Sequence, residues 1–116
     1  DKYILDFFIE VFHSLPMKVD TANNVRAAMH KMQEKDYDLI ITDFKMPQMS
    51  GRDLFYWIKE HRPHLSRRVI FVTGDTVSVE TRSFFEDNRN LFLAKPFKIE
   101  EVKEIIQQTL EANASA

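Results

Sequence analysis

Apolar residues at helical spacing mark five segments of the chain. The first has an apolar stripe from Ile4 to Leu15 and ends before Pro16, and the last has one from Ile99 to Leu110. Three further helices are expected between them: one capped by Asn23 or Asn24, one starting at the capping-box sequence 50–53, and one over about 77–86.

Apolar runs without helical spacing separate these helices. The runs at 38–43, 68–74 and 91–96 are nearly continuous, which is typical of strands buried on both faces, and a shorter strand is predicted at 17–22. Because helices and strands alternate strictly, we expect an α/β domain with a doubly wound parallel sheet and helices on both faces. The series begins with a helix, whereas such sheets ordinarily begin with a strand.

Chain length and composition indicate one domain. The 116 residues, 44% of them hydrophobic, are enough to bury a core, so residues 1–116 form one predicted domain with a polar, frayed tail at 111–116. The net charge of −2 provides no basic surface for nucleic acid. The apolar stretch 3–12 is too short to cross a bilayer, so no membrane association is expected. The lack of cysteine fits a reducing compartment, and a cytoplasmic location is expected.

Polar residues follow three of the predicted strands. Ligands of doubly wound sheets bind at the carboxyl ends of the strands, and there the chain has Asp43, then Thr73 and Gly74, then Lys95. A carboxylate, a hydroxyl and an ammonium at one edge suit an acyl-phosphate site. Asp43 would attack phosphorus, while Lys95 and Thr73 would bind the phosphoryl oxygens. Gly74 would leave the approach open and offer a backbone N–H.

Each of these residues also has an ordinary structural interpretation. A lone aspartate after a strand is commonly a turn or cap residue, a threonine is a β-former, and a lysine at a strand end is commonly solvated. The occurrence of Asp43, Thr73 and Lys95 at the ends of three successive predicted strands favours the functional interpretation. Pro96 either ends its strand or forms a cis peptide bond with Lys95. The histidines lack metal-ligand spacing, and no glycine-rich nucleotide loop occurs.

Three sequence strings, in this order and spacing, resemble the receiver domain of two-component response regulators and of hybrid histidine kinases. They are DLIITDFKMPQMSG at 38–51, VIFVTGD at 69–75 and FLAKPF at 92–97. The similarity extends over essentially the whole chain, and the last two strings look closer to receivers attached to hybrid kinases. The resemblance implies a flavodoxin-like, receiver-type fold of three layers and a role in a two-component phosphorelay.

By position, the resemblance also implies residue roles. Asp43 would be the phosphoacceptor, Thr73 the switch hydroxyl and Lys95 the phosphate-binding lysine. Phe92 corresponds to the switch aromatic of the family, whose rotamer changes together with the threonine and reshapes the surface around the last strand. The backbone carbonyl of Lys45 would be a Mg²⁺ ligand.

The chain departs from the family at its N-terminus. The first strand of the family ends in an acidic pair that binds Mg²⁺, whereas residues 1–12 resemble the family's segment directly after that pair, with Asp1 aligned just beyond it. Because Mg²⁺ prefers octahedral oxygen coordination with carboxylates, weak or absent Mg²⁺ binding is expected. The sheet is expected to lack its first strand, which leaves the strand at 17–22 without a neighbour. Residues outside this sequence would supply that strand, or alternatively another chain or a rearranged segment would fill the gap.

The expected function is a signalling switch. It would take a phosphoryl group onto Asp43 from a sensor histidine kinase or a histidine phosphotransfer protein, and it would then change its affinity for a partner. Such a protein catalyses only its own phosphorylation and dephosphorylation and is not an enzyme with turnover. A homodimer is compatible with the sequence.

Two alternative functions compete with the switch. A pseudo-receiver would be a protein-interaction module that takes no phosphate because its metal site is incomplete. A haloacid-dehalogenase-like phosphatase would need a second aspartate two residues after the first, where the chain has Lys45.

Overall fold

A computed structural model describes residues 2–13, 15, 17–22, 24–44, 51–74, 78–88 and 90–114, with the backbone alone for residues 2–5 and 114. Its sheet has three parallel strands in the order β1-β2-β3. The strands are β1 (Ile40–Asp43), β2 (Val69–Thr73) and β3 (Leu91–Ala94). The helices are α1 (Lys2–His13), α2 (Val25–Glu34), α3 (Gly51–His61), the 3₁₀ helix η1 (Pro63–Arg68), α4 (Val79–Asn88) and α5 (Ile99–Ala114).

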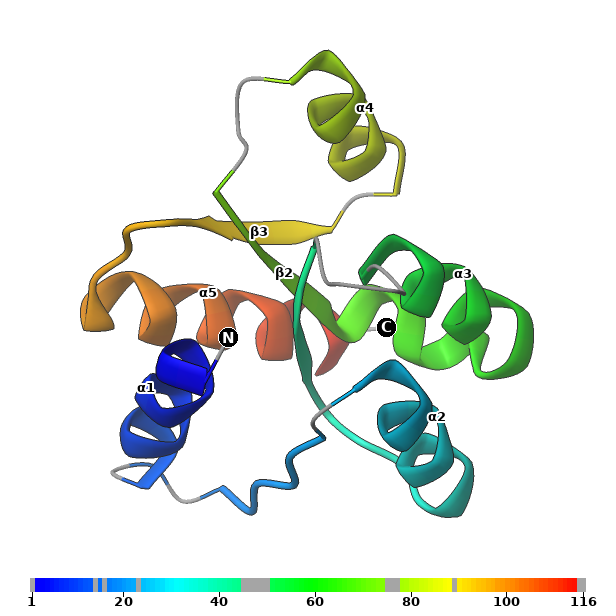
Figure 1. Ribbon diagram of the computed structural model, residues 1–116, viewed down its shortest axis with the longest axis horizontal. Coiled ribbons are helices and arrows are strands. Elements are labelled where there is room, and N and C mark those ends of the chain that lie inside the picture. Colours follow the sequence, from blue (N-terminus) through cyan, green and yellow to red (C-terminus); the bar gives the residue numbers. More distant parts are fainter. Residues whose placement is uncertain are drawn as a thin grey trace.

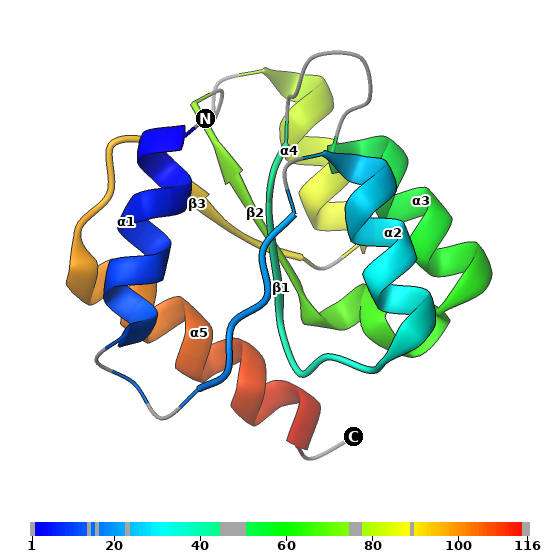
Figure 2. The same cartoon turned by 60° about the horizontal axis from the view of Figure 1, so that its bottom comes forward.

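Helices cover both faces of this sheet, as Figures 1 and 2 show from two directions. β2 is buried along its whole length, and its side chains alternate between the two faces. Val69 and Phe71 pack in one core with residues of α2, α3 and α4, whereas Ile70 and Val72 pack in a second core with residues of α1 and α5. The prediction of a three-layer α/β domain is confirmed.

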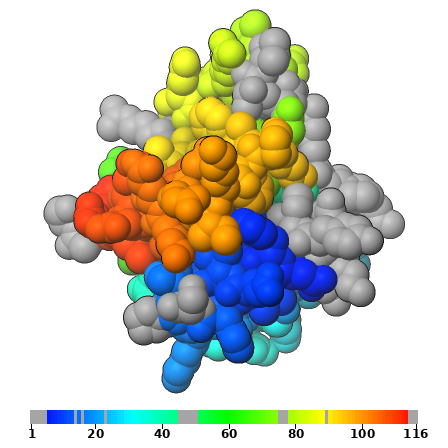
Figure 3. All heavy atoms as spheres, turned by 90° about the vertical axis from the view of Figure 1, so that its left-hand side faces the viewer, coloured from blue at the N-terminus to red at the C-terminus, as the bar shows by residue number. Residues whose placement is uncertain are grey.

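Aromatic contacts join α1 to the residue that precedes α5, and α1 and α5 are the two helices of the second core. Phe97, which precedes α5, lies against Phe7 and Phe8 of α1, with ring centroids 5.4 and 5.6 Å apart. α1 therefore lies beside the start of α5 on the molecular surface in Figure 3. Among the described residues, no helix combines the length and apolar character needed to cross a bilayer.

Several predicted boundaries differ from the structure. The predicted helix at 77–86 lies at Val79–Asn88, and η1 was not predicted from the sequence. Residues 111–114, expected to belong to a frayed tail, continue α5. Polar side chains hold this last turn, since the Asn113 amide donates to the carbonyl oxygens of Thr109 at 2.7 Å and Arg67 at 3.1 Å.

The predicted strand at 17–22 is wrong. The segment is not a strand, and in the described part of the chain the sheet contains only β1, β2 and β3. A strand needs a neighbour for its backbone hydrogen bonds, so an apolar pattern alone cannot make one. Side chains hold the segment instead. Tyr37 Oη donates to Asp20 Oδ2 at 2.8 Å, Lys35 pairs with the same oxygen, and Lys31 Nζ donates to the Thr21 carbonyl.

The Tyr37–Asp20 contact predicts a dependence of stability on pH. Partial burial, followed by the hydrogen bond to Asp20 and its charge, raises the pKa of Tyr37 to about 12 from 10.0. Because the folded chain holds this proton more tightly, its stabilising effect is complete below about pH 10 and is lost as the pH rises through about 12.

We expect Tyr37→Phe to reduce the fall in the free energy of unfolding over this range, measured by urea denaturation at about pH 9 and about pH 11.5. Tyr56→Phe is the matched control, since Tyr56 is 51% exposed on α3. An equal fall in both variants would contradict the assignment.

Candidate functional site

The carboxyl ends of the three strands meet at one edge of the sheet. In the register, Asp43 lies opposite Val72, and Thr73 lies opposite Ala94. The Lys95 amide then donates to the Thr73 carbonyl at 2.8 Å, which continues the ladder by one residue. Parallel pairing thus brings together the edge residues that the strand-end pattern predicted.

Asp43 and Lys95 form an ion pair at this edge. Lys95 Nζ lies 3.2 Å from Asp43 Oδ2, with side-chain exposures of 32% and 19%. Since both groups are partly shielded from water, their attraction is screened less than that of a surface pair. An ammonium held beside a carboxylate can stabilise negative charge that develops on a group bound there.

Thr73 and Gly74 are the other two residues predicted at the strand ends. Thr73 is buried, whereas Gly74 is exposed. A Cβ built on Gly74 would meet no heavy atom within 4 Å, so the space beside it is open and does not depend on the glycine. The Lys95–Pro96 peptide bond is cis, which was one of the two interpretations of Pro96.

Gly51, at the start of α3, is a positioning residue that the sequence analysis missed. Its amide donates to the Phe44 carbonyl at 2.9 Å, and an added Cβ would lie 2.3 Å from the carbonyl oxygen of Asp43. Only a residue without a side chain allows α3 this close to β1. The sequence does contain one indication of this role. Glycine is a poor helix former, yet one of the two glycines of the chain lies at a predicted helix start.

Of the remaining predicted site residues, the structure describes Phe92 but not Asp1 or Lys45. Phe92, on β3, is 40% exposed and stacks on Phe85 of α4, with ring centroids 4.7 Å apart and an angle of 13° between the rings. Asp1 and Lys45 lie outside the described residues, so their predicted roles at a metal stay predictions.

The described residues do not fit a Mg²⁺ ion. Nowhere in the described ranges do three acidic, histidine or cysteine side chains gather closely enough to hold a metal. At the strand ends, Asp43 is paired with a cation instead, Lys95. Mg²⁺ is usually held by one or two carboxylates together with phosphate and water. Among the described residues at this edge, Asp43 could be one such carboxylate ligand, but it is not a complete site.

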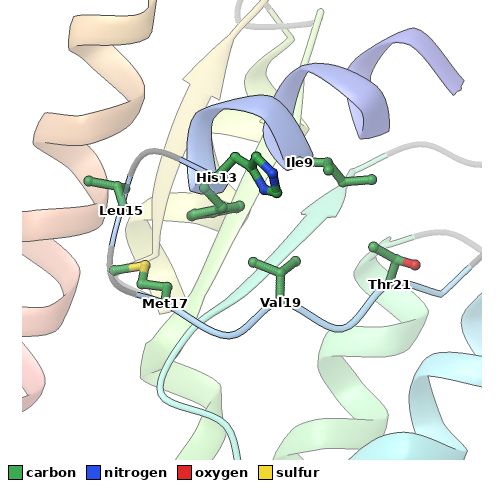
Figure 4. Close-up of a pocket in the computed structure, with 7 residues that line it drawn as sticks. Ile9, His13, Leu15, Met17, Val19 and Thr21 are labelled. Atoms are coloured by element: carbon green, nitrogen blue, oxygen red, sulfur yellow. The ribbon is translucent and has the colours of Figure 1, made fainter.

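A cavity lies beside α1, and most of the side chains that line it are apolar. It has a volume of about 330 Å³. Figure 4 shows it between α1 and the extended segment after that helix. We call it the α1 groove, and its lining residues are Ile9, Phe12, His13, Leu15, Met17, Val19 and Thr21.

Because β1 is an edge strand in the described sheet, one row of its backbone groups has no strand partner.

Comparisons with solved structures agree with this architecture. A receiver domain protein described as CheY-like from Methanospirillum hungatei has a TM-score of 0.87 at 24% identity, covering 99% of this chain and 90% of that one. The signal receiver domain of an HD domain-containing protein from Pseudomonas fluorescens has a TM-score of 0.86 at 24% identity, covering 100% and 92%. At this identity the likeness shows the fold alone.

Sequence relatives extend the comparison. The chain is 27% identical over 110 residues to hybrid signal transduction histidine kinase K of Dictyostelium discoideum, covering 89% of this chain and 9% of that protein. It is 29% identical to response regulator Rre1 of Synechocystis, covering 80% of this chain and 40% of that one. The chain thus spans less than half of these relatives. The profile of the response regulator receiver domain family matches residues 1–107, and the chain therefore belongs to that family.

Proposed function

We propose that the chain is a phosphorylatable receiver in a two-component phosphorelay, with Asp43 as its phosphoacceptor. The observation that carries this proposal is the Asp43–Lys95 ion pair at the carboxyl ends of the parallel strands, 3.2 Å apart. It joins a nucleophile to a group that can neutralise a phosphoryl oxygen. Family membership supports the same role.

The proposed reaction forms an acyl phosphate. A carboxylate oxygen of Asp43 attacks phosphorus, the P–N bond of a donor phosphohistidine breaks, and the imidazole leaves with the bonding electron pair and is protonated by solvent. Lys95 would exchange its contact with Asp43 Oδ2 for one with a phosphoryl oxygen. The Thr73 hydroxyl would bind another. Hydrolysis of the acyl phosphate would return Asp43 to its carboxylate.

The partner of this reaction would be a histidine kinase or a histidine phosphotransfer protein. A relative is itself named a hybrid signal transduction histidine kinase, and others are named response regulators. We infer a donor of that chemistry for this chain. The phosphorylated form would then shift a two-state equilibrium that favours binding of an output partner.

We further propose that the α1 groove receives an additional parallel strand, paired with the free edge of β1. Five of the seven residues that line the groove are apolar, and three of these, Ile9, Met17 and Val19, are 37–43% exposed. A strand parallel to β1 would end beside Asp43, so acidic residues at its end could supply the missing metal ligands.

The function is tested by intact mass. We expect the purified chain, incubated with Mg²⁺ and the acyl-phosphate donor acetyl phosphate, to gain one phosphoryl unit. Asp43→Asn should remove the gain, because an amide oxygen is a far weaker nucleophile than a carboxylate. Asp53→Asn, at an exposed position in the first turn of α3, is the matched control and should retain it.

Two results would contradict the proposal. A gain that persists in Asp43→Asn would place the phosphoryl group elsewhere. No gain by a folded chain, even after a strand with an acidic end is joined to it, would favour a pseudo-receiver.

A further inference from the structure

Two charged stripes flank an exposed tyrosine on the outward face of α3. Tyr56 is 51% exposed. At 3.6 residues per turn, Arg52 and Lys59 lie within about 60° of Tyr56 on one side of the helix, and we call them the basic stripe. Asp53 and Glu60 lie within about 60° of it on the other side, and we call them the acidic stripe. Because α3 lies at the periphery in Figures 1 and 2, this face can meet a second molecule.

The helix does not neutralise these charges by itself. Opposite charges on a helix attract each other when they are three or four residues apart, and no such spacing joins the two stripes. Among the described residues, no carboxylate forms an ion pair with Arg52 or Lys59, and no cation forms one with Glu60. Asp53 has another contact within the chain, and its carboxylate can still accept from a second donor. The stripes are therefore available to a partner.

Contacts with α4 hold the basic stripe and the tyrosine in place. The guanidinium carbon of Arg52 lies 4.9 Å from the ring centroid of Phe84. The Tyr56 ring meets the same ring edge-on, with centroids 5.9 Å apart and an angle of 89°. Lys59 Nζ donates to Asn88 Oδ1 at 3.2 Å. Side chains that are already ordered lose less conformational freedom on binding, and tyrosine and arginine are enriched among the residues that dominate binding energies.

The charge pattern indicates what kind of partner fits this face. The two stripes are opposite in sign and parallel to each other, so a second copy of the chain is complementary to the first. If two copies of α3 lie side by side and parallel, a two-fold axis along the helices sets the basic stripe of each against the acidic stripe of the other. An antiparallel pair would instead set basic against basic and acidic against acidic, which is unfavourable.

We propose that two copies of this chain associate through α3 in the parallel orientation, with Tyr56 of each copy at the centre of the contact. Lys59 then faces Glu60 of the second copy, and Arg52 faces Asp53 of the second copy. Each of these contacts occurs twice, because the axis relates the two copies.

The size of the contact sets the expected strength of the dimer. Two helices of 11 residues make a smaller contact than a standard interface, which buries about 800 Å² per partner, so a weak and concentration-dependent dimer is expected. The orientation also has a consequence for the candidate site. Because α3 begins beside Asp43, the parallel arrangement puts the Asp43 edges of both copies at the same end of the dimer. The association itself does not require a phosphoryl group.

The test is sedimentation velocity of the purified chain over a series of concentrations. The unmodified chain should show a monomer–dimer equilibrium. Lys59→Glu and Glu60→Lys, made separately, should each raise the dissociation constant about tenfold or more, because each places like charges in both symmetry-related contacts. An equimolar mixture of the two variants should associate as the unmodified chain does, since each variant supplies the charge that the other lacks.

A matched pair of control variants separates the face of α3 from the net charge of the chain. Lys103 and Glu104 are also adjacent, and both are exposed on α5. Lys103→Glu and Glu104→Lys make the same changes in net charge, and they should leave the dissociation constant unchanged. Circular dichroism checks that each variant is folded, which is expected because all four positions are exposed.

Several results would overturn the proposal. They are a chain that stays monomeric at every concentration, an equal effect of the α3 and α5 variants, and a mixture that does not associate. A tighter dimer in Lys59→Glu would indicate the antiparallel orientation and would overturn it as well. The intact mass after acetyl phosphate treatment reports phosphorylation of Asp43 separately, so the dimer and the proposed function can fail independently.

Discussion

Replacing Lys95 with methionine is expected to slow phosphoryl transfer to Asp43 by about 10²- to 10³-fold, the usual effect of removing one group that stabilises transition-state charge. The reason is geometric. Lys95 Nζ lies 3.2 Å from Asp43 Oδ2 and the lysine side chain is only 32% exposed, so its charge acts where water screens it poorly. Methionine keeps the aliphatic character of the side chain and removes the charge.

The measurement is the rate at which the intact mass rises after acetyl phosphate is added. Lys98→Met is the matched control, since Lys98 is exposed and its backbone N–H, not its ammonium, bonds Glu101 Oε1 at 3.0 Å. That variant should react at the rate of the unmodified chain. Equal rates in the Lys95 and Lys98 variants would remove Lys95 from the proposed mechanism.

Joining an apolar strand with an acidic end to the N-terminus is expected to raise the free energy of unfolding by about 3 kcal/mol. This is the scale of one or two apolar side chains transferred from water into the α1 groove, at about 1.5–3 kcal/mol each. The added strand would also pair with the free edge of β1, whose residues are only half-buried at present. Urea denaturation measures the change.

The same chain should acquire Mg²⁺ binding, because carboxylates at the end of the added strand would lie beside Asp43. Calorimetric titration with Mg²⁺ detects this, and the control strand carries asparagine in place of its acidic residues. A second control has proline at the centre of the strand, where the missing N–H disrupts pairing. If the proline strand stabilises the chain equally, β1 does not pair with the added segment and the groove proposal fails.

The sequence determined the order of the five α-helices and of β1, β2 and β3, and the edge at which their polar end residues lie, but it misassigned residues 17–22 and missed η1. Hydrophobic period separates most helices from strands, and the alternation of the two after residue 25 leads to a parallel sheet. Parallel strands end at the same edge, so Asp43, Thr73 and Lys95 could be placed together from their positions alone. These inferences need only local patterns and a general rule of topology.

Only the tertiary structure decided the contacts between segments distant in the chain. The Asp43–Lys95 pair spans 52 positions, and the approach of Gly51 to Asp43 depends on how α3 lies against β1. The Phe85–Phe92 stack depends on the relative placement of α4 and β3. Residues 17–22 have an apolar pattern suited to a strand, yet they are not one, because a strand exists only where a neighbouring strand accepts its hydrogen bonds.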